Sequence, residues 1–218
     1  MKLKLLFSVV FACTLFTTSY AQINKGSSWV GSSFSYGKIQ DEAEQPAIPD
    51  LDIRATSIQP AWGVAVKENL VVGIFGNYYK VATKTGDMRN YREERFGGGV
   101  FARRYVPVFK KFYIYGESRL GYQTTEIKTN EYWSGGGYTY TNKGWETGLT
   151  LTPGISYGIT KNLQLEAGFT SLFNMWYGKS KYSYDTETTK SNTFRAGANL
   201  ENLSAFTVGF RFLINKKA

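Results

Sequence analysis

Trp145-Glu-Thr-Gly-Leu-Thr-Leu-Thr-Pro-Gly-Ile-Ser-Tyr-Gly158 is the stretch that decides the fold, because its side chains alternate between two kinds. One parity is mostly apolar and carries Trp145, Thr147, Leu149, Leu151, Pro153, Ile155 and Tyr157. The other parity carries Glu146 among glycines and hydroxyl residues. A period of two is the signature of a β-strand with one apolar and one polar face. The stretch therefore predicts a strand between an apolar and a polar environment.

The same alternation recurs along the chain. It is clear over residues 57–66, 112–122, 163–170 and 206–214, and three further strands are expected at 28–37, 70–81 and 95–106. The parity of 95–106 is ambiguous, because Phe101 shares its parity with Arg103, and Val100 shares its parity with Arg104. With 145–158 these segments make eight strands. The predicted fold is all-β, an eight-stranded antiparallel up-and-down transmembrane β-barrel.

The predicted connections alternate in length. Short turns are expected near 67–69, 106–111 and 160–162, and long loops at about 38–52, 82–94, 124–143 and 175–192. This asymmetry is typical of outer-membrane barrels, which have short periplasmic turns and longer external loops. It predicts that both termini lie on the periplasmic side.

Two prolines lie inside predicted strands. The stretches Pro60 to Leu70 and Pro153 to Leu163 align without a gap, and each reads as strand, Lys/Asn turn and strand. Proline cannot donate a backbone hydrogen bond to a ladder. We therefore expect bulges or local breaks at Pro60 and Pro153.

The N-terminus has the pattern of an export signal. Lys2 and Lys4 precede an apolar run, which is followed by the small residues Ser19 and Ala21 around Tyr20. This is the arrangement of a secretory signal peptide, here residues 1–21, cleaved before Gln22. Residues 22–218 would then form the barrel domain, and no segment has the roughly 18 consecutive apolar residues of a membrane helix.

Two residue types that carry much enzyme chemistry are missing from the mature chain expected after cleavage. The chain contains no histidine, and its one cysteine, Cys13, lies inside the predicted signal peptide. This removes Ser-His-Asp chemistry, Cys-His chemistry and the usual zinc sites. No cofactor is expected, because Gly97-Gly98-Gly99 is not followed by the Lys-Ser/Thr of a phosphate loop. No metal site is expected either, and the chain is predicted not to be an enzyme.

The charge balance is basic, with 26 Lys+Arg against 17 Asp+Glu. Removal of Lys2 and Lys4 with the signal peptide leaves 24 basic against 17 acidic residues, a net charge of +7. A basic surface favours acidic partners. For an exported chain these would be outer-membrane lipids and lipopolysaccharide phosphates, and nucleic acid is not expected. The alternative to a bound acidic partner is that these charged residues only keep the loops and turns solvated, and the sequence supports it equally.

Periodicity alone does not say which face of a barrel is apolar, so the contents of the polar face must decide. That face carries Glu117, Arg119, Glu146, Glu166 and Arg211. These charges fit a narrow lumen, which eight strands leave just wide enough for side chains. We expect a closed salt-bridge network there, because an uncompensated buried charge costs about 3 to 5 kcal/mol. A lumenal conduction path and a soluble lipocalin-like barrel are the alternatives.

Aromatic residues gather near the predicted strand ends, as in the interfacial girdles of membrane barrels. They are Tyr36, Trp62, Tyr78, Tyr105, Phe112, Tyr122, Trp145, Tyr157 and Trp176. The last strand, Thr207 to Ile214, resembles the assembly signal of outer-membrane barrels, although Asn215-Lys-Lys-Ala218 follows it. The barrel-assembly machinery is therefore an expected partner.

Phe101-Ala-Arg-Arg-Tyr105, followed by Lys111-Phe-Tyr-Ile-Tyr-Gly116-Glu-Ser-Arg-Leu-Gly121-Tyr, carries a family resemblance. With the two proline-containing hairpins, it resembles the small outer-membrane β-barrel family that includes OmpA-like and OmpX-like domains and porin-family relatives. The resemblance implies an eight-stranded meander with a mostly occluded lumen. It also implies roles in envelope integrity, adhesion or limited permeation, and no catalytic site.

These observations predict an outer-membrane protein with a structural or surface-interaction role through its external loops. The candidate loop surface, toward an unknown external ligand or protein, comprises Tyr132, Trp133, Tyr138, Tyr140, Lys179 and Lys181. A narrow porin-like channel for small solutes is the alternative function, and a soluble ligand-binding barrel is the third.

Overall fold

The computed structural model describes residues 23–41, 50–86, 89–133, 136–169, 171–184, 187–198 and 206–214. The expected signal peptide, 1–21, lies outside these residues. Within the described ranges, no helix is long and apolar enough to cross a membrane.

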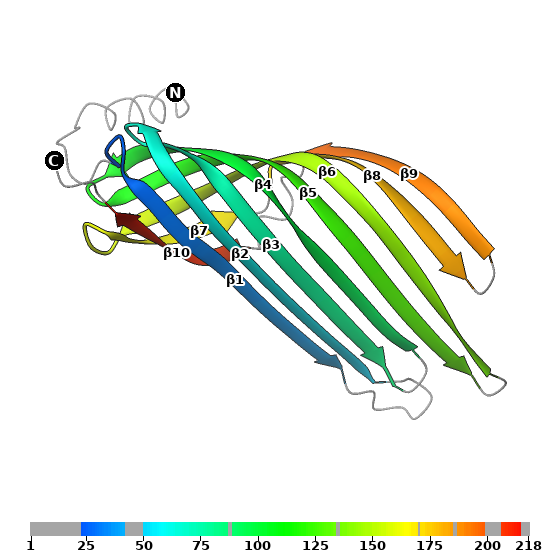
Figure 1. The fold of residues 1–218 in the computed structure, drawn as a ribbon. Helices are drawn as coiled ribbons and strands as arrows, with labels where there is room; N and C mark the ends of the chain where they lie inside the picture. The colour runs from blue at the N-terminus through cyan, green and yellow to red at the C-terminus, as the bar shows by residue number, and fades with distance from the viewer. Residues whose placement is uncertain are drawn as a thin grey trace, which may run out of the picture.

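The described chain forms ten strands in one antiparallel sheet (Figure 1). They are β1 (Ser28–Asp41), β2 (Leu51–Lys67), β3 (Leu70–Thr85), β4 (Arg89–Phe109), β5 (Phe112–Trp133), β6 (Gly136–Gly158), β7 (Leu163–Phe169), β8 (Phe173–Tyr184), β9 (Glu187–Ala198) and β10 (Phe206–Ile214).

Eight of these strands close into a ring. Going round it, the order is β1, β2, β3, β4, β5, β6, β7 and β10, and β10 pairs with β1. The ring confirms the predicted eight-stranded antiparallel barrel. β8 and β9 form a hairpin between β7 and β10 in the chain, and β8 pairs with β6 beyond the end of β7.

The wall is closed at one end and split at the other. β10 pairs with β1 from Ser28↔Ile214 to Phe34↔Val208, whereas the rest of β1 pairs only with β2. β9 pairs with β8, and among the described residues no strand pairs with its other edge. Figure 1 shows the β8–β9 hairpin diverging from β1. We call the two parts the closed half and the split half.

Three of the predicted long loops were wrong. Residues 82–94 and 124–143 mostly extend the β3–β4 and β5–β6 hairpins, and 175–192 contains the β8–β9 turn. These segments carry polar residues on both faces, so the apolar alternation stops while the backbone ladder continues. The fourth loop, 38–52, is shortened by the ends of β1 and β2. The short turns predicted near 67–69 and 160–162 were correct, and the one predicted at 106–111 is shorter, because β4 continues to Phe109 and β5 begins at Phe112.

Both strand prolines lie at local breaks, as predicted. The β2–β3 ladder is interrupted between Ile58↔Tyr78 and Ala61↔Phe75, opposite Pro60, without a change of register. Pro153 lies where β6 changes its partner from β8 to β7. The register shifts occur elsewhere, between Ala65 and Lys67 and between Pro107 and Phe109.

The two faces of the ring have opposite character. Exposed apolar side chains of the closed strands form an outer band that we call the apolar belt: Val30, Phe34, Ile58, Trp62, Val66, Val72, Ile74, Val100, Ile114, Leu120, Leu151, Leu165, Val208, Phe210, Phe212 and Ile214. The structure also resolves the ambiguous strand, since Phe101 and Arg103 are buried while Val100 is exposed.

An aromatic core fills the interior near the short turns. It comprises Ile23, Trp29, Ala61, Ala65, Val71, Phe101, Tyr105, Tyr113, Tyr115 and Leu213. Gly154 makes room for it, because a Cβ there would overlap the Tyr115 ring. The sequence analysis did not predict this core.

Two residues predicted for the outer girdles belong to the interior instead. Tyr105 is buried inside the barrel. Its hydroxyl accepts a hydrogen bond from Trp29 Nε1 at 2.9 Å and donates one to Glu166 Oε1 at 2.7 Å. Trp176 lines an interior cavity and packs over Gly148, where a Cβ would meet its ring.

Candidate functional site

Strand parity places the five predicted lumenal charges on the inner face of the barrel. Glu117 and Arg119 come from β5, Glu146 from β6, Glu166 from β7 and Arg211 from β10. The structure brings four of them together and separates Glu146 from the rest. It also adds one residue that the sequence reasoning missed, Arg103 of β4.

Arg103 lies at the centre of a buried ion-pair network. Its Nη2 is 2.5 Å from Glu117 Oε2, and its Nη1 is 2.5 Å from Glu166 Oε2. Arg119 pairs with the other oxygen of Glu117, and Arg211 Nε lies 3.1 Å from Glu166 Oε2. We call these five residues the floor cluster. The ambiguous parity of 95–106 concealed Arg103 from the sequence analysis.

Aromatic rings enclose the Arg103 guanidinium. Its Cζ is 4.8 Å from the ring centroid of Trp29 and 4.2 Å from that of Tyr115. Its Nη1 also donates to the Tyr105 hydroxyl at 3.1 Å. A desolvated cation over aromatic faces is stabilised by their quadrupoles. The floor cluster and the aromatic core therefore form one packed unit.

Arg211 ties the last strand of the ring to the first. Its Nη1 donates to the Ser32 carbonyl oxygen at 2.8 Å, and its Nη2 donates to Ser33 Oγ at 2.9 Å. Both acceptors belong to β1, which β10 pairs with to close the ring. A lumenal charge thus also stabilises barrel closure.

Glu146 belongs to a second charged group, which we call the upper cluster: Glu93, Arg95, Glu146 and Arg195. Glu146 lies 2.5 Å from Arg195 and 3.8 Å from Arg95, and Arg95 lies 2.5 Å from Glu93. The sequence analysis missed the other members because Glu93 fell in a predicted loop, Arg95 in the ambiguous strand, and Arg195 outside every predicted strand.

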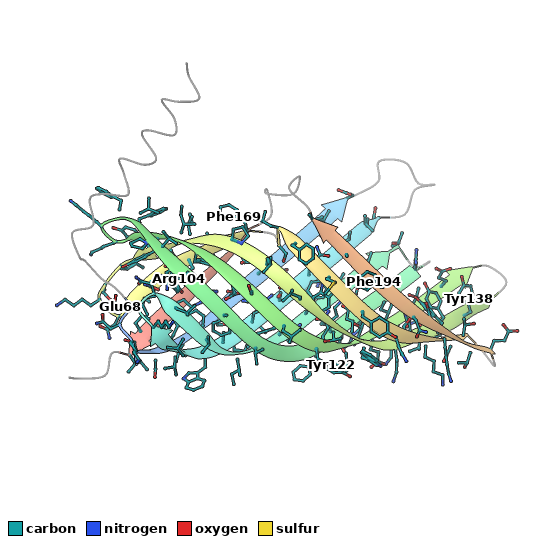
Figure 2. The ribbon with its side chains drawn as sticks, turned by 90° about the horizontal axis from the view of Figure 1, so that it is seen from above. Glu68, Arg104, Tyr122, Tyr138, Phe169 and Phe194 are labelled. Carbon is teal, nitrogen blue, oxygen red and sulfur yellow. The ribbon has the colours of Figure 1, made fainter. Side chains whose placement is uncertain are left out.

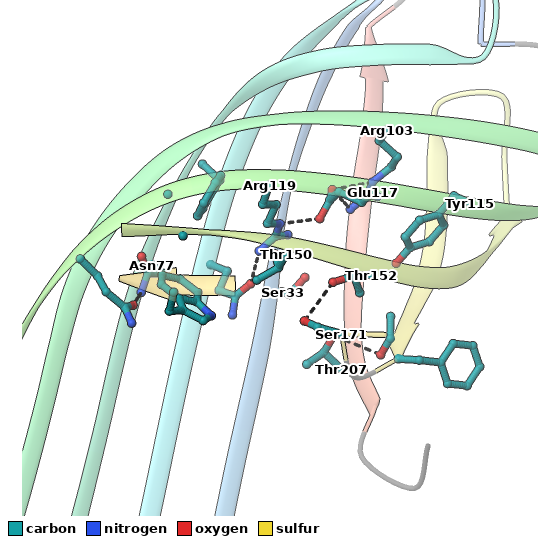
Figure 3. A pocket seen from close by; sticks show the side chains of 18 of the residues that line it. Ser33, Asn77, Arg103, Tyr115, Glu117, Arg119, Thr150, Thr152, Ser171 and Thr207 are labelled. Atoms are coloured by element: carbon teal, nitrogen blue, oxygen red, sulfur yellow. Dashed lines mark hydrogen bonds and ion pairs between the residues drawn. The ribbon is translucent and has the colours of Figure 1, made fainter. Parts of the chain in front are cut away.

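A cavity of about 290 Å³ lies between the two clusters (Figure 3). Arg103, Glu117 and Arg119 line it from the floor cluster, and Gln123 and Asn77 from the side of the upper cluster. Its polar wall includes Gln59, Thr150, Thr152, Ser171 and Thr207, and its aromatic wall includes Phe75, Phe169 and Trp176. The interior is therefore filled near the short turns and hollow further along.

The predicted loop surface does not form one patch. Tyr138 and Tyr140 stack with ring centroids 6.3 Å apart and share the inward parity of Glu146. Lys179 and Lys181 are exposed on β8, opposite Trp145 and Lys143, and so have the outward parity. The side chains of Tyr132 and Trp133 lie outside the described residues. Figure 2 places Tyr138 at the far end of the barrel from Glu68 and Arg104.

The strands continue beyond the apolar belt, where their outer face becomes charged. Glu94 pairs there with Arg92 at 2.5 Å, and Glu126 pairs with Lys128 at 3.0 Å. Beyond the belt on β2, a hydrogen bond from Arg54 lowers the pKa of the Asp52 carboxyl. Burial and a hydrogen bond to Glu93 raise the pKa of the Tyr91 hydroxyl.

The described residues include no cluster of three or more His, Cys, Asp or Glu side chains placed to hold a metal ion. No protein-family model matches the chain. No curated protein matches it either.

Solved structures of similar shape exist at low sequence identity. The outer membrane protein OprG from Pseudomonas aeruginosa is 12% identical, with 91% of this chain and 100% of that chain covered and a TM-score of 0.48. A major outer membrane protein from Thermus thermophilus is 9% identical, with 88% and 100% covered and a TM-score of 0.47. Neisserial surface protein A is 14% identical, with 86% and 99% covered and a TM-score of 0.37.

Proposed function

We propose that the chain is an outer-membrane β-barrel with an occluded lumen and a structural or surface-interaction role beyond the membrane. The observation that carries this proposal is the apolar belt around a ring whose charges are buried inside. In the last strand, Phe210 and Phe212 are 52% and 53% exposed, while Arg211 between them is 2% exposed. A soluble lipocalin-like barrel has the reverse arrangement, because its exterior meets water.

The height of the belt fits a lipid bilayer. On β3 the outward residues Val72 and Ile74 of the belt lie between Leu70 and Tyr78, which share their parity, and this apolar stretch is nine residues long. A tilted transmembrane strand needs about 9 to 11 residues to cross the hydrocarbon core. Charged outer residues such as Lys80 and Lys84 follow on the same strand. The belt comprises sixteen exposed apolar side chains, and large exposed apolar patches on a protein mark sites of contact with a partner or a membrane, which supports lipid as its environment.

Occlusion is proposed from the packed interior. The floor cluster and the aromatic core block the lumen near the short turns, since Trp29, Arg103, Tyr105 and Tyr113 are buried almost completely. A narrow channel for small solutes is the second candidate function, favoured by the cavity of about 290 Å³ above the floor cluster. We place it second because the ion pairs would have to open for a solute to pass.

Export and assembly complete the proposal. The predicted signal peptide would deliver the chain to the periplasm, and the exposed outer face of β10 would be read by the barrel-assembly machinery. The exposed Lys179 and Lys181 would contact lipopolysaccharide phosphates. No catalytic activity is proposed, because no histidine or mature cysteine is present to supply a nucleophile–base pair.

Two experiments test the proposal. The membrane fraction is run on a denaturing gel with and without boiling, and a folded barrel is expected to change its migration on heating. Recovery of the protein in the soluble periplasm would refute the membrane assignment. Single-channel recording in planar bilayers is expected to show no steady conductance, and a stable open level would favour the channel instead.

A further inference from the structure

The floor cluster contains more positive than negative charge. Its three guanidinium groups, Arg103, Arg119 and Arg211, face only two carboxylates, Glu117 and Glu166. Each ion pair in the cluster is formed with one of these two carboxylates, so two guanidinium groups share each carboxylate. The cluster therefore has a net charge of +1 in the interior of the barrel.

Neighbouring groups do not supply the missing negative charge. The upper cluster is balanced, with Arg95 and Arg195 against Glu93 and Glu146. Neutral amides separate the two clusters, because Gln123 donates to Glu146 and accepts from Asn77 Nδ2 at 3.0 Å. Tyr105 donates its hydroxyl hydrogen to Glu166 and so remains neutral.

Arginine does not relieve this excess by losing its proton, because the guanidinium group stays protonated in proteins. A buried charge without a partner is costly. An anion from solution, held where the cluster meets the cavity, would neutralise it.

Arg119 is the guanidinium that meets the cavity. Its side chain is 19% exposed, against 1 to 2% for the other four members of the floor cluster. Its Nε donates to Glu117, and its Nη1 donates to Gln59 Oε1 at 2.6 Å. A guanidinium has five N–H donors in a planar fork, so donors remain for a carboxylate. Thr150 lies directly across the ladder from Arg119 on the same inner face.

We propose that this cavity binds a small organic carboxylate, with the carboxylate on Arg119 and the carbon skeleton against Phe75 and Trp176. The hydroxyls of Thr150, Thr152, Ser171 and Thr207 line the cavity and would contact polar groups of the ligand. The volume of about 290 Å³ is at the low end of ligand pockets, and since a cavity of about 150 Å³ holds benzene, it restricts the ligand to about a dozen non-hydrogen atoms. The site does not depend on the proposed membrane location, because it lies inside the ring.

Acetate is the probe, with acetamide as a neutral analogue of nearly the same shape. The full mature chain in detergent micelles is titrated by calorimetry, and its unfolding temperature is followed by the mobility of unboiled samples on gels. Acetate is expected to bind and raise the unfolding temperature, because a ligand that binds only the folded state stabilises it. Acetamide is expected to do neither. Equal effects of the two compounds would overturn the proposal, and chloride binding as tightly as acetate would overturn the carboxylate class.

Arg119→Gln removes the excess charge, so it is expected to weaken acetate binding by about tenfold or more, the loss expected for a charged hydrogen bond. Arg92→Gln is the matched control, because Arg92 is exposed on the outer face of β4. Unchanged affinity in Arg119→Gln, or an equal loss in Arg92→Gln, would contradict the site.

Thr150→Glu tests the same inference by supplying the carboxylate from the chain itself. Cross-strand neighbours lie about 4.5 to 5.5 Å apart at Cβ, so the new side chain would reach Arg119. This variant is expected to lose acetate binding and to unfold, without acetate, at a higher temperature than the parent chain. Retained acetate binding by folded Thr150→Glu would overturn the proposal. If this variant does not fold, Arg119→Gln and the acetamide comparison still decide.

Discussion

The closed and split halves of the barrel belong to one sheet but differ in what lies inside them. In the closed half, β10 pairs with both β1 and β7, and the interior holds the aromatic core and the floor cluster. In the split half, β9 pairs with β8 alone among the described strands, and its side chains are nearly all exposed. The ladders from β1 to β6 run the whole length of both halves, and only the seam on the other edge of β1 differs. That seam is paired where interior side chains pack across the lumen and open where they do not.

The sequence of the β8–β9 hairpin gives a physical reason for the difference. Its inward positions include the small residues Gly178, Ser180, Ser191 and Thr193. The large inward residue Arg195 pairs with Glu146 of β6 and not with β1. In the closed half, Trp29 of β1 donates to Tyr105 of β4, and Arg103 of β4 pairs with Glu166 of β7, so side chains meet across the lumen. Pro153 marks the boundary, since β6 changes its partner there.

Removing one carboxylate from the floor cluster should break the closed half. Glu166→Gln deprives Arg103 and Arg211 of a shared partner and is expected to lower the free energy of unfolding by about 3 to 5 kcal/mol, the cost of an uncompensated buried charge. Urea unfolding in detergent, followed by tryptophan fluorescence, measures the change. Glu187→Gln, at the exposed end of β9, is the control and should change it by less than about 0.5 kcal/mol. Similar effects in both variants would show that the halves do not differ.

A pair of glycine substitutions tests interior packing. Gly154→Ala would push a Cβ into the buried Tyr115 ring and is expected to lower the free energy of unfolding by about 1 to 3 kcal/mol. Gly197→Ala is the matched control, since the nearest atom to its Cβ would be Asn174 Oδ1 at 3.9 Å. The same urea titration reports both. A neutral Gly154→Ala would mean that the closed half is not tightly packed.

Hydrogen exchange compares the halves without mutation. The backbone amides of β9 are expected to exchange at least about tenfold faster than those of β7 and β10, because elements with few buried contacts open locally at low cost. Mass spectrometry of peptides from the exchanged barrel gives the rates. Equal protection of β9 and β10 would contradict the division into two halves.

The smallest effect is expected beyond the apolar belt, at Asp52. The folded pKa of this carboxyl is depressed by Arg54, so its contribution to stability is present above the unfolded pKa of about 3.9 and is lost as pH falls through the folded value. Asp52→Asn should therefore unfold at a slightly lower temperature at pH 7 and match the parent chain near pH 2. A difference that persisted at low pH would assign the effect to something other than the ion pair.

Much of the candidate site followed from parity alone. Glu117, Arg119, Glu166 and Arg211 were placed on the polar face because charges and apolar residues alternate in their strands. Arg103 was not placed on the polar face, since each face of its strand carries both apolar and charged residues. The interior aromatics were also missed, because an inward tyrosine such as Tyr105 and an outward one such as Tyr122 look alike without their partners.

The sequence by itself determined the class of the fold, the number of strands in the ring and the short turns, because local alternation and turn residues can be read along one strand. It also indicated the outward direction of the belt, because the charges that share the polar faces of several strands fit a narrow lumen. Only the tertiary structure decided which charges pair, where the interior is filled and where the wall splits. Those features depend on side chains that come from different strands and meet across the lumen, at distances that no local pattern encodes.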